Sequence, residues 1–486
     1  MTTKLISPVL YDDYEPEMFI SETTVHQEKE DGVEQHEEKS PPADLYGIVN
    51  IVFYLLGTSI LLPWFFFVTC NDYWMYRFRD LHNHSSSLQY VFELNDNESN
   101  RTSLQADFTS YISIASTVPS TLFLFVNIFY LKKFSIHWLI VISSLIVLVL
   151  FVETTILVLF DSDSWQTLFF IITVTTVVIL NLSTAVLQAS LSALFIKFPT
   201  AYISAATSGQ SLAGIFAAVA QITVLLINAS PTKSTFLYFV FADITILLSL
   251  LGYLYIRKTD FFQYYARDNA LQRIDSHPQL SGSSSPIQYR SFYDSELSLT
   301  VFVNTPILPV NYFSIFKKTW ILTLSILCCY VVTCSVYPAI AVLVCSEYMT
   351  MKSPWADKYF VPVITYLLYC TCEYSGRFLA GYVQKPKGIF LVCLSFIRLI
   401  FVPLLMFCNA QPRHHLPVLI QSDLVYAFII VIFAMSNGYI STLTFILLPS
   451  SVMVHEQEVA STMLITSLAC GLSIGSLLSF PLINLL

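Results

Sequence analysis

The sequence predicts an all-α, polytopic membrane protein whose eleven transmembrane helices fall into groups of six and five. Two observations support this fold class. Hydrophobic residues make up 55% of the chain and charged residues only 12%, whereas a soluble domain carries roughly 25% charged residues. The apolar residues also fall into blocks, many of about 20 residues, the length with which a helix crosses ~30 Å of hydrocarbon. Because lipid offers the backbone no hydrogen-bond partners, each block should be helical.

Polar segments divide the chain into its predicted regions. A tail, 1–45, precedes the first six spans in 46–256, and a linker, 257–318, separates them from the last five spans in 319–486. A second long polar segment, 70–107, follows the first span. The predicted spans are, in order, 46–69, 108–131, 136–160, 166–196, 200–228, 235–256, 319–345, 359–384, 389–409, 424–448 and 459–485.

The tail differs in charge from the rest of the chain. It holds twelve acidic residues and three lysines, which account for the whole net charge of −9. Such a composition buries too little apolar surface to fold, so the tail should be disordered. It is not a signal peptide, because no basic start precedes an apolar core. No basic patch elsewhere would bind a nucleic acid polymer.

Sequons and basic residues predict the orientation. The segment 70–107 contains three Asn-x-Ser/Thr sites, at Asn83, Asn97 and Asn100, and such sites are glycosylated only on an extracellular or lumenal surface. With that segment outside, the opposite side carries 15 Lys and Arg against 7, as the positive-inside rule requires. The amino terminus should therefore be cytosolic and the carboxyl terminus extracellular or lumenal. Two helical halves joined by a cytosolic linker are typical of alternating-access carriers.

Five ionisable residues lie within the predicted spans, where a charge costs ~2.5–3.5 kcal/mol and indicates a function by default. Glu373 and Arg377 are four residues apart and therefore share one helix face. The pair is either a structural ion pair between helices or a polar site for a hydroxylated solute, since a carboxylate accepts from hydroxyls and a guanidinium donates. Glu153, Asp243 and Arg398 are single charges that we expect to bond to neighbouring helices.

Two spans carry stripes of small residues, which allow another helix to approach closely. The stripes are Ala205, Gly209, Ala213 and Ala217 in the fifth span and Ser467, Gly471, Gly475 and Ser479 in the eleventh.

Two further side chains are unusual in mid-span. Trp64 follows Pro63 in the first span, away from the interfacial belt where tryptophan is common. It either faces lipid or offers a flat surface to an aromatic ligand. Gln188 lies deep in the fourth span, where its amide either bonds a neighbouring helix or reads the edge of a nucleobase.

Five short motifs, taken in order, resemble those of the equilibrative nucleoside transporters, a solute carrier family, and the resemblance covers almost everything after residue 45. They are Leu56 to Phe66, with its Pro-Trp pair; Leu187 to Ser190, followed by Ser208 to Gly214; the acid-x-x-Gly-Arg of Glu373 to Arg377; Arg398 to Leu405; and Ser436 to Tyr439.

The resemblance implies a major-facilitator-like fold with one helix missing, and facilitated diffusion of nucleosides by alternating access. Transport of nucleobases, an influence of protons and a preference for purines or pyrimidines are left open. It also implies that Trp64 lines the nucleoside cavity, that Gln188 bonds the base, and that Glu373 and Arg377 hold the ribose. Further positions implied near the ligand are Leu61, Thr117 and Leu472.

The chain departs from the family pattern in places. Phe65 stands where the family usually has Asn after the Pro-Trp pair, and Glu373 where it commonly has Asp. The segment Tyr73-Trp74-Met75 looks most similar to the lysosomal member, yet the tail holds no clean acidic dileucine signal. We therefore favour the plasma membrane, with a lysosomal or endosomal membrane as the alternative.

The sequence offers little support for other classes of protein. No constellation of a metal triad, or of a nucleophile with a base, indicates an enzyme, and we expect no cofactor or metal. A carrier for another hydroxylated solute, such as a sugar, is the alternative, because the pair of Glu373 and Arg377 would suit it equally. The expected partners are a nucleoside and the lipid bilayer, with no obligate protein partner evident.

Overall fold

The computed structural model describes residues 42–79, 115–116, 118–128, 134–227, 230–266, 311–349, 353–411, 413 and 415–486. Nine of the described helices are long and apolar enough to cross a membrane, and they coincide with nine of the eleven predicted spans. The first group of helices contains α1 (Ile48–Thr69), α2 (Asn71–Arg77), α5 (Ile136–Leu159), α6 (Gln166–Phe195), α7 (Thr200–Ile227), α8 (Pro231–Ile256) and α9 (Asp260–Ala266). The second contains α10 (Tyr312–Val336), α11 (Tyr369–Tyr382), α12 (Ile389–Ile397), α13 (Phe401–Met406), α14 (Asp423–Leu447) and α15 (Gln457–Asn484).

The other two predicted spans are described in a different form. Of the span 108–131, only residues 115–116 and 118–128 are described, and these are helical. The span 359–384 follows a π-helical segment, Trp355–Tyr359, and consists of a second one, Val361–Leu368, and α11. The structure therefore supports a helical membrane protein, and the total of eleven spans stays a prediction.

Some boundaries differ from those that hydropathy predicts. Helix α10 begins at Tyr312, inside the predicted linker, because Asn311 caps it by accepting a hydrogen bond from Ser314 N at 3.1 Å. Asp44, in the predicted tail, accepts hydrogen bonds from the N–H groups of Val49 and Asn50 in the first turn of α1. Capping residues are polar, so a window of apolar residues places the start of α10 too far inside the helix, whereas the predicted start of the first span, residue 46, lies just before α1.

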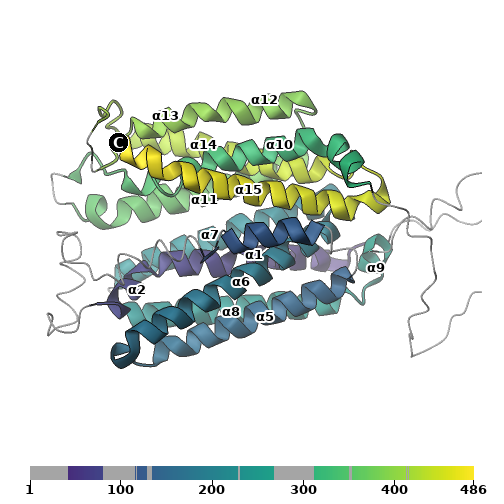
Figure 1. Ribbon diagram of the computed structural model, residues 1–486, viewed down its shortest axis with the longest axis horizontal. Coiled ribbons are helices and arrows are strands. Elements are labelled where there is room, and N and C mark those ends of the chain that lie inside the picture. Colours follow the sequence, from purple (N-terminus) through teal and green to yellow (C-terminus); the bar gives the residue numbers. More distant parts are fainter. Residues whose placement is uncertain are drawn as a thin grey trace, which may run out of the picture. The chain divides into compact units, whose positions relative to one another are not determined.

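Close backbone approach organises each group of helices (Figure 1). In the first group α7 packs along α1, and a Cβ atom at Gly209 would lie 2.2 Å from the Tyr54 carbonyl oxygen. In the second group α15 packs along α10, and a Cβ atom at Gly475 would lie 2.7 Å from the Val331 carbonyl oxygen. Both small-residue stripes therefore have the packing role that the sequence predicts.

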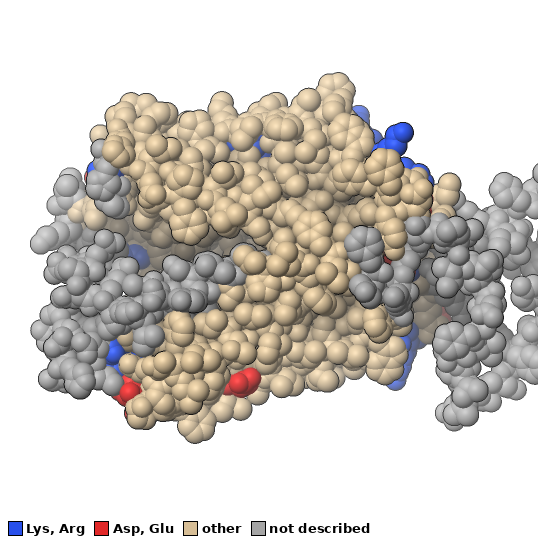
Figure 2. Space-filling model, viewed as in Figure 1, with Lys and Arg blue, Asp and Glu red and all other residues tan. Residues whose placement is uncertain are grey.

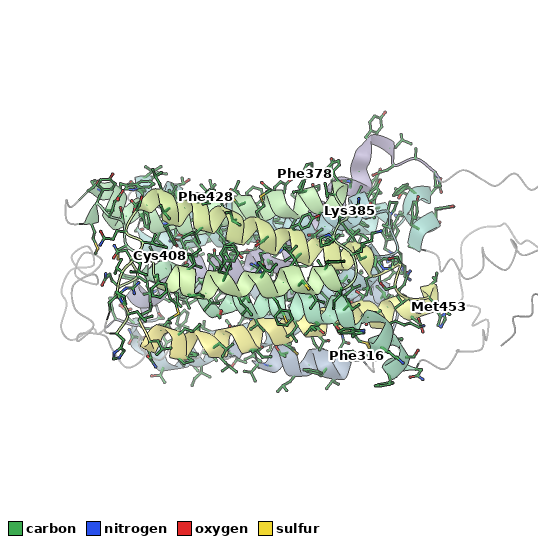
Figure 3. All side chains as sticks on the ribbon, turned by 90° about the horizontal axis from the view of Figure 1, so that it is seen from above. Phe316, Phe378, Lys385, Cys408, Phe428 and Met453 are labelled. Atoms are coloured by element: carbon green, nitrogen blue, oxygen red, sulfur yellow. The ribbon has the colours of Figure 1, made fainter. Side chains whose placement is uncertain are left out.

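Large apolar side chains cover the outside of the spans. Examples are Phe316, Phe378 and Phe428, which are 49%, 44% and 64% exposed (Figure 3). On the face drawn in Figure 2, the surface between the two ends of the spans carries almost no charge. Because a soluble monomer rarely exposes apolar surface on this scale, this surface is suited to lipid.

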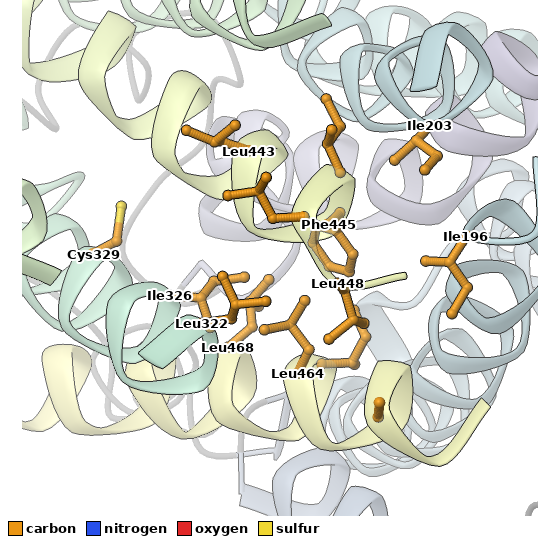
Figure 4. Close-up of a cluster of buried hydrophobic side chains, with 14 of the residues drawn as sticks. Ile196, Ile203, Leu322, Ile326, Cys329, Leu443, Phe445, Leu448, Leu464 and Leu468 are labelled. Carbon is orange, nitrogen blue, oxygen red and sulfur yellow. The ribbon is translucent and has the colours of Figure 1, made fainter. Parts of the chain in front are cut away.

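Among the described residues, the buried cluster with members from both groups lies at the end of α6 and α14 (Figure 4). There, Ile196 and Ile203 from the first group belong to one cluster with Leu448 and Leu464 from the second. An ion pair between Lys197 Nζ and Glu458 Oε1, at 3.0 Å, joins the groups at the same end. We call this the closed end. Toward the end where α2 lies, most of each group's buried apolar residues fall in separate clusters, and Figure 2 shows a hollow between the groups.

Candidate functional site

Glu373 and Arg377 form an ion pair inside the protein. Their spacing of four residues places both on one face of α11, and Arg377 Nη2 donates to Glu373 Oε1 at 3.0 Å. The residues are only 7% and 3% exposed. Burying two charges is costly unless further hydrogen bonds satisfy them, so the surrounding side chains decide whether the pair is stable.

Helix α7 of the first group supplies some of these hydrogen bonds. Ser211 Oγ donates to Glu373 Oε2 at 3.0 Å, while Arg377 Nη1 donates to Gln210 Oε1 at 2.9 Å and to the Thr207 carbonyl at 2.8 Å. The pair therefore lies where the two helix groups meet. Arg377 Nε is buried and has no hydrogen-bond partner among the described residues.

Helix α14 completes the shell around Glu373. Asn437 Nδ2 donates to Glu373 Oε1 at 2.8 Å. The two helices approach closely because each has a glycine at the contact, Gly376 on α11 and Gly438 on α14. A Cβ atom at Gly438 would lie 2.1 Å from the Glu373 carbonyl oxygen, so a larger residue there would push the helices apart.

Arg398 belongs to the same polar network. Its Nη1 donates to the Cys329 carbonyl at 2.8 Å and its Nε to Ser436 Oγ at 3.0 Å. Asn437 Oδ1 accepts from Arg398 Nη1 at 3.3 Å and from Thr333 Oγ1 at 2.7 Å. The prediction that Arg398 bonds neighbouring helices is confirmed. The hydrogen bonds of Asn437, which join Arg398 to the Glu373–Arg377 pair, were not predicted from the sequence.

The first span comes close to this site. Beside Gly214 on α7, a Cβ atom would lie 2.5 Å from Cys370 Sγ and 3.0 Å from Phe65 Cζ. Gly214 is three residues after Ser211, and Cys370 is three residues before Glu373. Phe65 therefore contacts both helices about one turn from the hydrogen bond that joins them.

The remaining residues predicted near a ligand lie on several elements. Trp64 and Leu61 are half-buried on α1 and pack against the core cluster of the first group, and Leu472 on α15 packs against the shared core. Gln188 on α6 is half-buried, and its amide makes no hydrogen bond to the described residues. Thr117, Asn83, Asn97 and Asn100 lie outside the described residues.

The other two single charges behave differently. Asp243 Oδ2 accepts from Thr155 Oγ1 at 2.7 Å, which joins α8 to α5 as the sequence predicts. Its Oδ1 is buried without a partner among the described residues. Glu153 is half-buried, and its side chain has no hydrogen bond or ion pair in the described part of the chain, so the expected helix contact is not observed.

Three polar residues of this site were not predicted from the sequence to be site residues. Gln210 and Ser211 lie in the stretch Ser208 to Gly214, and Asn437 lies in Ser436 to Tyr439. All three are at most 9% exposed. The available signal was a hydrogen-bonding side chain within an apolar span, but serine, glutamine and asparagine occur in several spans. Among the described residues, no group of three His, Cys, Asp or Glu could hold a metal ion.

Comparison with known proteins identifies the family to which the chain is similar. A family model described as a nucleoside transporter matches residues 174–484. Rat equilibrative nucleoside transporter 2 is 33% identical over 90% of this chain and 97% of its own length. Human equilibrative nucleoside transporter 1 is 30% identical over 90% and 97%, and rat equilibrative nucleoside transporter 3 is 30% identical over 90% and 88%.

A solved structure supports the fold alone. The major facilitator superfamily proton:xylose symporter XylE, bound to 6-bromo-6-deoxy-D-glucose, has a TM-score of 0.53 at 13% identity and covers 90% of this chain and 87% of its own. The two helix groups with a buried polar site at their junction thus define a membrane carrier with a major-facilitator-like fold. The chain belongs to the equilibrative nucleoside transporter family, a family of transporters and not of enzymes.

Proposed function

We propose that this chain moves nucleosides across a membrane by facilitated diffusion, through alternating access to a site between its two helix groups. The observation that carries the proposal is the buried pair of Glu373 and Arg377 at the junction of α7, α11 and α14. Ribose hydroxyls can donate to the carboxylate and accept from the guanidinium. A buried donor without a partner costs free energy, and a ribose oxygen bound to Arg377 Nε would remove that cost.

The base end of the nucleoside is assigned to the first group of helices. Trp64 offers a flat aromatic face, and the amide of Gln188, which has no partner among the described residues, offers a donor and an acceptor to a base edge. The Phe65 contact beside Cys370 supports this assignment, because it brings the Pro-Trp segment within about one turn of the Glu373 level. Leu61, Thr117 and Leu472 are proposed as further residues near the ligand.

The arrangement of the cores supports one stage of alternating access. The buried cluster shared by the two groups lies at the closed end, together with the ion pair of Lys197 and Glu458. With a cytosolic amino terminus, the closed end faces the cytosol and the site opens to the outside. Transport then requires this end to separate while the opposite end closes.

For location, we propose the plasma membrane, with the carboxyl terminus and the segment 70–107 outside. The resemblance of Tyr73-Trp74-Met75 to the lysosomal member leaves a lysosomal membrane as the alternative. Surface biotinylation of cells that express the chain separates the two. Mutation of Asn83, Asn97 and Asn100 to Gln should raise gel mobility to that of glycosidase-treated protein. If the mobility does not change, the predicted orientation is supported only by the distribution of Lys and Arg between the two sides.

The ribose assignment is tested with Arg377→Lys, which keeps the charge but removes the planar fork. The measurement is uptake of labelled uridine by the reconstituted protein in the presence of unlabelled uridine or of dideoxyuridine, which lacks the two ring hydroxyls. The ratio of the two inhibitory concentrations gives the preference for uridine. The native chain should prefer uridine by roughly tenfold or more, since hydrogen bonds to charged groups contribute ~1.5–3 kcal/mol. Arg377→Lys should abolish most of this preference.

Arg398→Lys is the matched control, because it changes another buried arginine of the same network. It should leave the preference for uridine intact, whatever it does to the maximal rate. An unchanged preference in Arg377→Lys would remove the ribose role and leave the ion pair structural. Competition by glucose as strong as that by uridine would favour a sugar carrier instead.

A further inference from the structure

Two adjoining cavities lie where α8 ends and the chain turns into α9. One, of about 290 Å³, is lined by His137, Arg257, Phe262, Gln263 and Ala266. The other, of about 690 Å³, is lined by Leu254, Tyr255, Arg257, Lys258 and Gln263. Because Arg257 and Gln263 line both, the two cavities form one recess, which we call the α8–α9 recess. It lies apart from the site at Glu373 and Arg377.

Two basic side chains, Arg257 and Lys258, line the α8–α9 recess. Arg257 and Lys258 are exposed, and neither side chain has an ion pair or hydrogen bond in the described part of the chain. His137 on the recess wall is held by a contact of 2.6 Å between its Nδ1 and Tyr253 Oη. Among the described residues, no acidic side chain lines either cavity. An anion entering the recess would therefore meet two cations that have no ion pair in the described part of the chain.

The walls of the recess are fixed by packing. Phe262 is 2% exposed, and its ring lies 5.4 Å from that of Phe198. Gln263 Nε2 donates to the Arg257 carbonyl at 3.3 Å, and Thr259 Oγ1 donates to the Ile256 carbonyl at 2.7 Å. These contacts hold the turn between α8 and α9 in place, so the recess is largely preformed.

One side of the recess continues into the lipid-facing surface of α8. Exposed apolar residues recur every three or four positions along this helix: Ile244, Leu247, Leu248, Leu251, Leu254 and Tyr255. The last two also line the larger cavity. An occupant would thus contact an apolar stripe on one side and two cations on the other. On the face drawn in Figure 2, basic side chains gather at the end where α9 lies, as expected where a span meets lipid headgroups.

We propose that the α8–α9 recess binds the phosphate headgroup of an anionic phospholipid, with the acyl chains along the exposed stripe of α8. Arg257 and Lys258 contact the phosphate, and Leu254 and Tyr255 contact the upper part of the chains. Basic side chains beside a span attract anionic lipids in this way. The site does not depend on which solute the carrier transports, and a bound lipid would stabilise the turn that leads into α9.

The test measures binding of a fluorescent phosphatidylinositol monophosphate to the full-length protein in phosphatidylcholine nanodiscs. Arg257→Gln combined with Lys258→Gln should weaken binding by about tenfold or more, since each basic side chain near a membrane surface contributes about 1 kcal/mol. The matched control is Lys385→Gln combined with Lys387→Gln, which removes two exposed charges from the loop after α11 and should change binding little.

Two further variants and one competition experiment distinguish loss of the lipid site from other causes of weaker binding. Arg257→Lys combined with Lys258→Arg preserves both charges and should keep binding, which separates loss of charge from loss of folding. Leu254→Ser should weaken binding with both cations in place. Inorganic phosphate should not displace the lipid. Equal weakening by the two double Gln variants would overturn the proposal, because it would indicate general attraction to charge. Displacement by inorganic phosphate would overturn it in favour of a soluble ligand.

Discussion

At the scale of single residues, Asn437 joins two parts of the polar site that are separate in sequence. Its Nδ2 donates to Glu373, while its Oδ1 accepts from Thr333 and Arg398. An amide has one donor end and one acceptor end, so these partners fix its orientation. The carboxylate of Glu373 therefore faces only donors, from Ser211, Asn437 and Arg377.

Replacing Asn437 by Asp should make transport depend on pH. The new carboxylate would lie beside that of Glu373, and two carboxylates that share a site do not readily both ionise. Uridine uptake by Asn437→Asp should be low at neutral pH and rise as the pH falls, because one proton then restores a donor between the two groups. Uptake by the native chain, measured over the same range in vesicles, is the reference. A parallel profile for both proteins would contradict this account of the network.

Trp64 and Gln188 should affect base recognition differently. Every base has an aromatic face, so Trp64→Ala should weaken all nucleosides about equally, on the scale of ~1–3 kcal/mol found for base stacking in nucleic-acid binders. Gln188→Leu should weaken purines and pyrimidines unequally, because only hydrogen bonds distinguish base edges. Competition of a panel of nucleosides against labelled uridine measures both effects. Equal losses for all bases in Gln188→Leu would assign the glutamine to helix packing.

At the scale of helices, glycine contacts set how closely the elements of the site approach. The contact of α11 and α14 at Gly376 and Gly438 lets Asn437 reach Glu373. Two π-helical segments precede α11 and lead into the polar site. Such departures from α-helical winding are frequent at functional sites. The polar shell around the ion pair is thus built where α7, α11 and α14 meet.

Gly438→Ala should destabilise the protein and reduce uptake more than Gly252→Ala does. At Gly438 the added Cβ meets the Glu373 carbonyl at 2.1 Å, which is backbone, whereas at Gly252 it meets Val52 Cγ2 at 3.0 Å, at the end of a side chain. Overpacking of this kind typically costs 1–3 kcal/mol. Thermal unfolding in detergent and uridine uptake provide the comparison. Similar melting temperatures for the two variants would contradict a backbone contact at Gly438.

At the scale of the whole molecule, the shared core and one ion pair hold the closed end together. Lys197 and Glu458 belong to different helix groups, whereas Lys318 and Glu456 belong to the same group and pair at 2.7 Å. Only the first pair must break when the closed end opens. The second pair lies two residues away along the chain and provides an internal control.

Glu458→Gln should increase opening of the closed end, and Glu456→Gln should not. Because the Lys197–Glu458 pair is partly exposed, the effect should be modest, about 1 kcal/mol or less. Hydrogen exchange of the first turns of α15 should be a few times faster in Glu458→Gln than in the native chain. Equal acceleration in both variants would indicate local fraying of α15.

Flux through the reconstituted protein should be saturable and stop at equal concentrations on the two sides. The sequence holds no phosphate-binding Gly-rich loop with Lys-Ser/Thr, so ATP hydrolysis has no recognisable site. Uridine uptake into vesicles without ion gradients should reach a plateau at the outside concentration. Accumulation well above that level would exclude an equilibrative mechanism.

The amino-acid sequence was enough to predict the fold class and the place of most spans, because the cost of exposing polar backbone to lipid requires long apolar helices. It also determined that Glu373 and Arg377 share a helix face, since helical spacing is local, and that α7 and α15 pack through small residues. The three-dimensional structure was needed to show that Ser211, Gln210 and Asn437 surround this pair. It was also needed to show that a recess lined by Arg257 and Lys258 lies at the end of α8. These arrangements depend on which helix faces meet across long sequence separations, and hydropathy carries no information about that pairing.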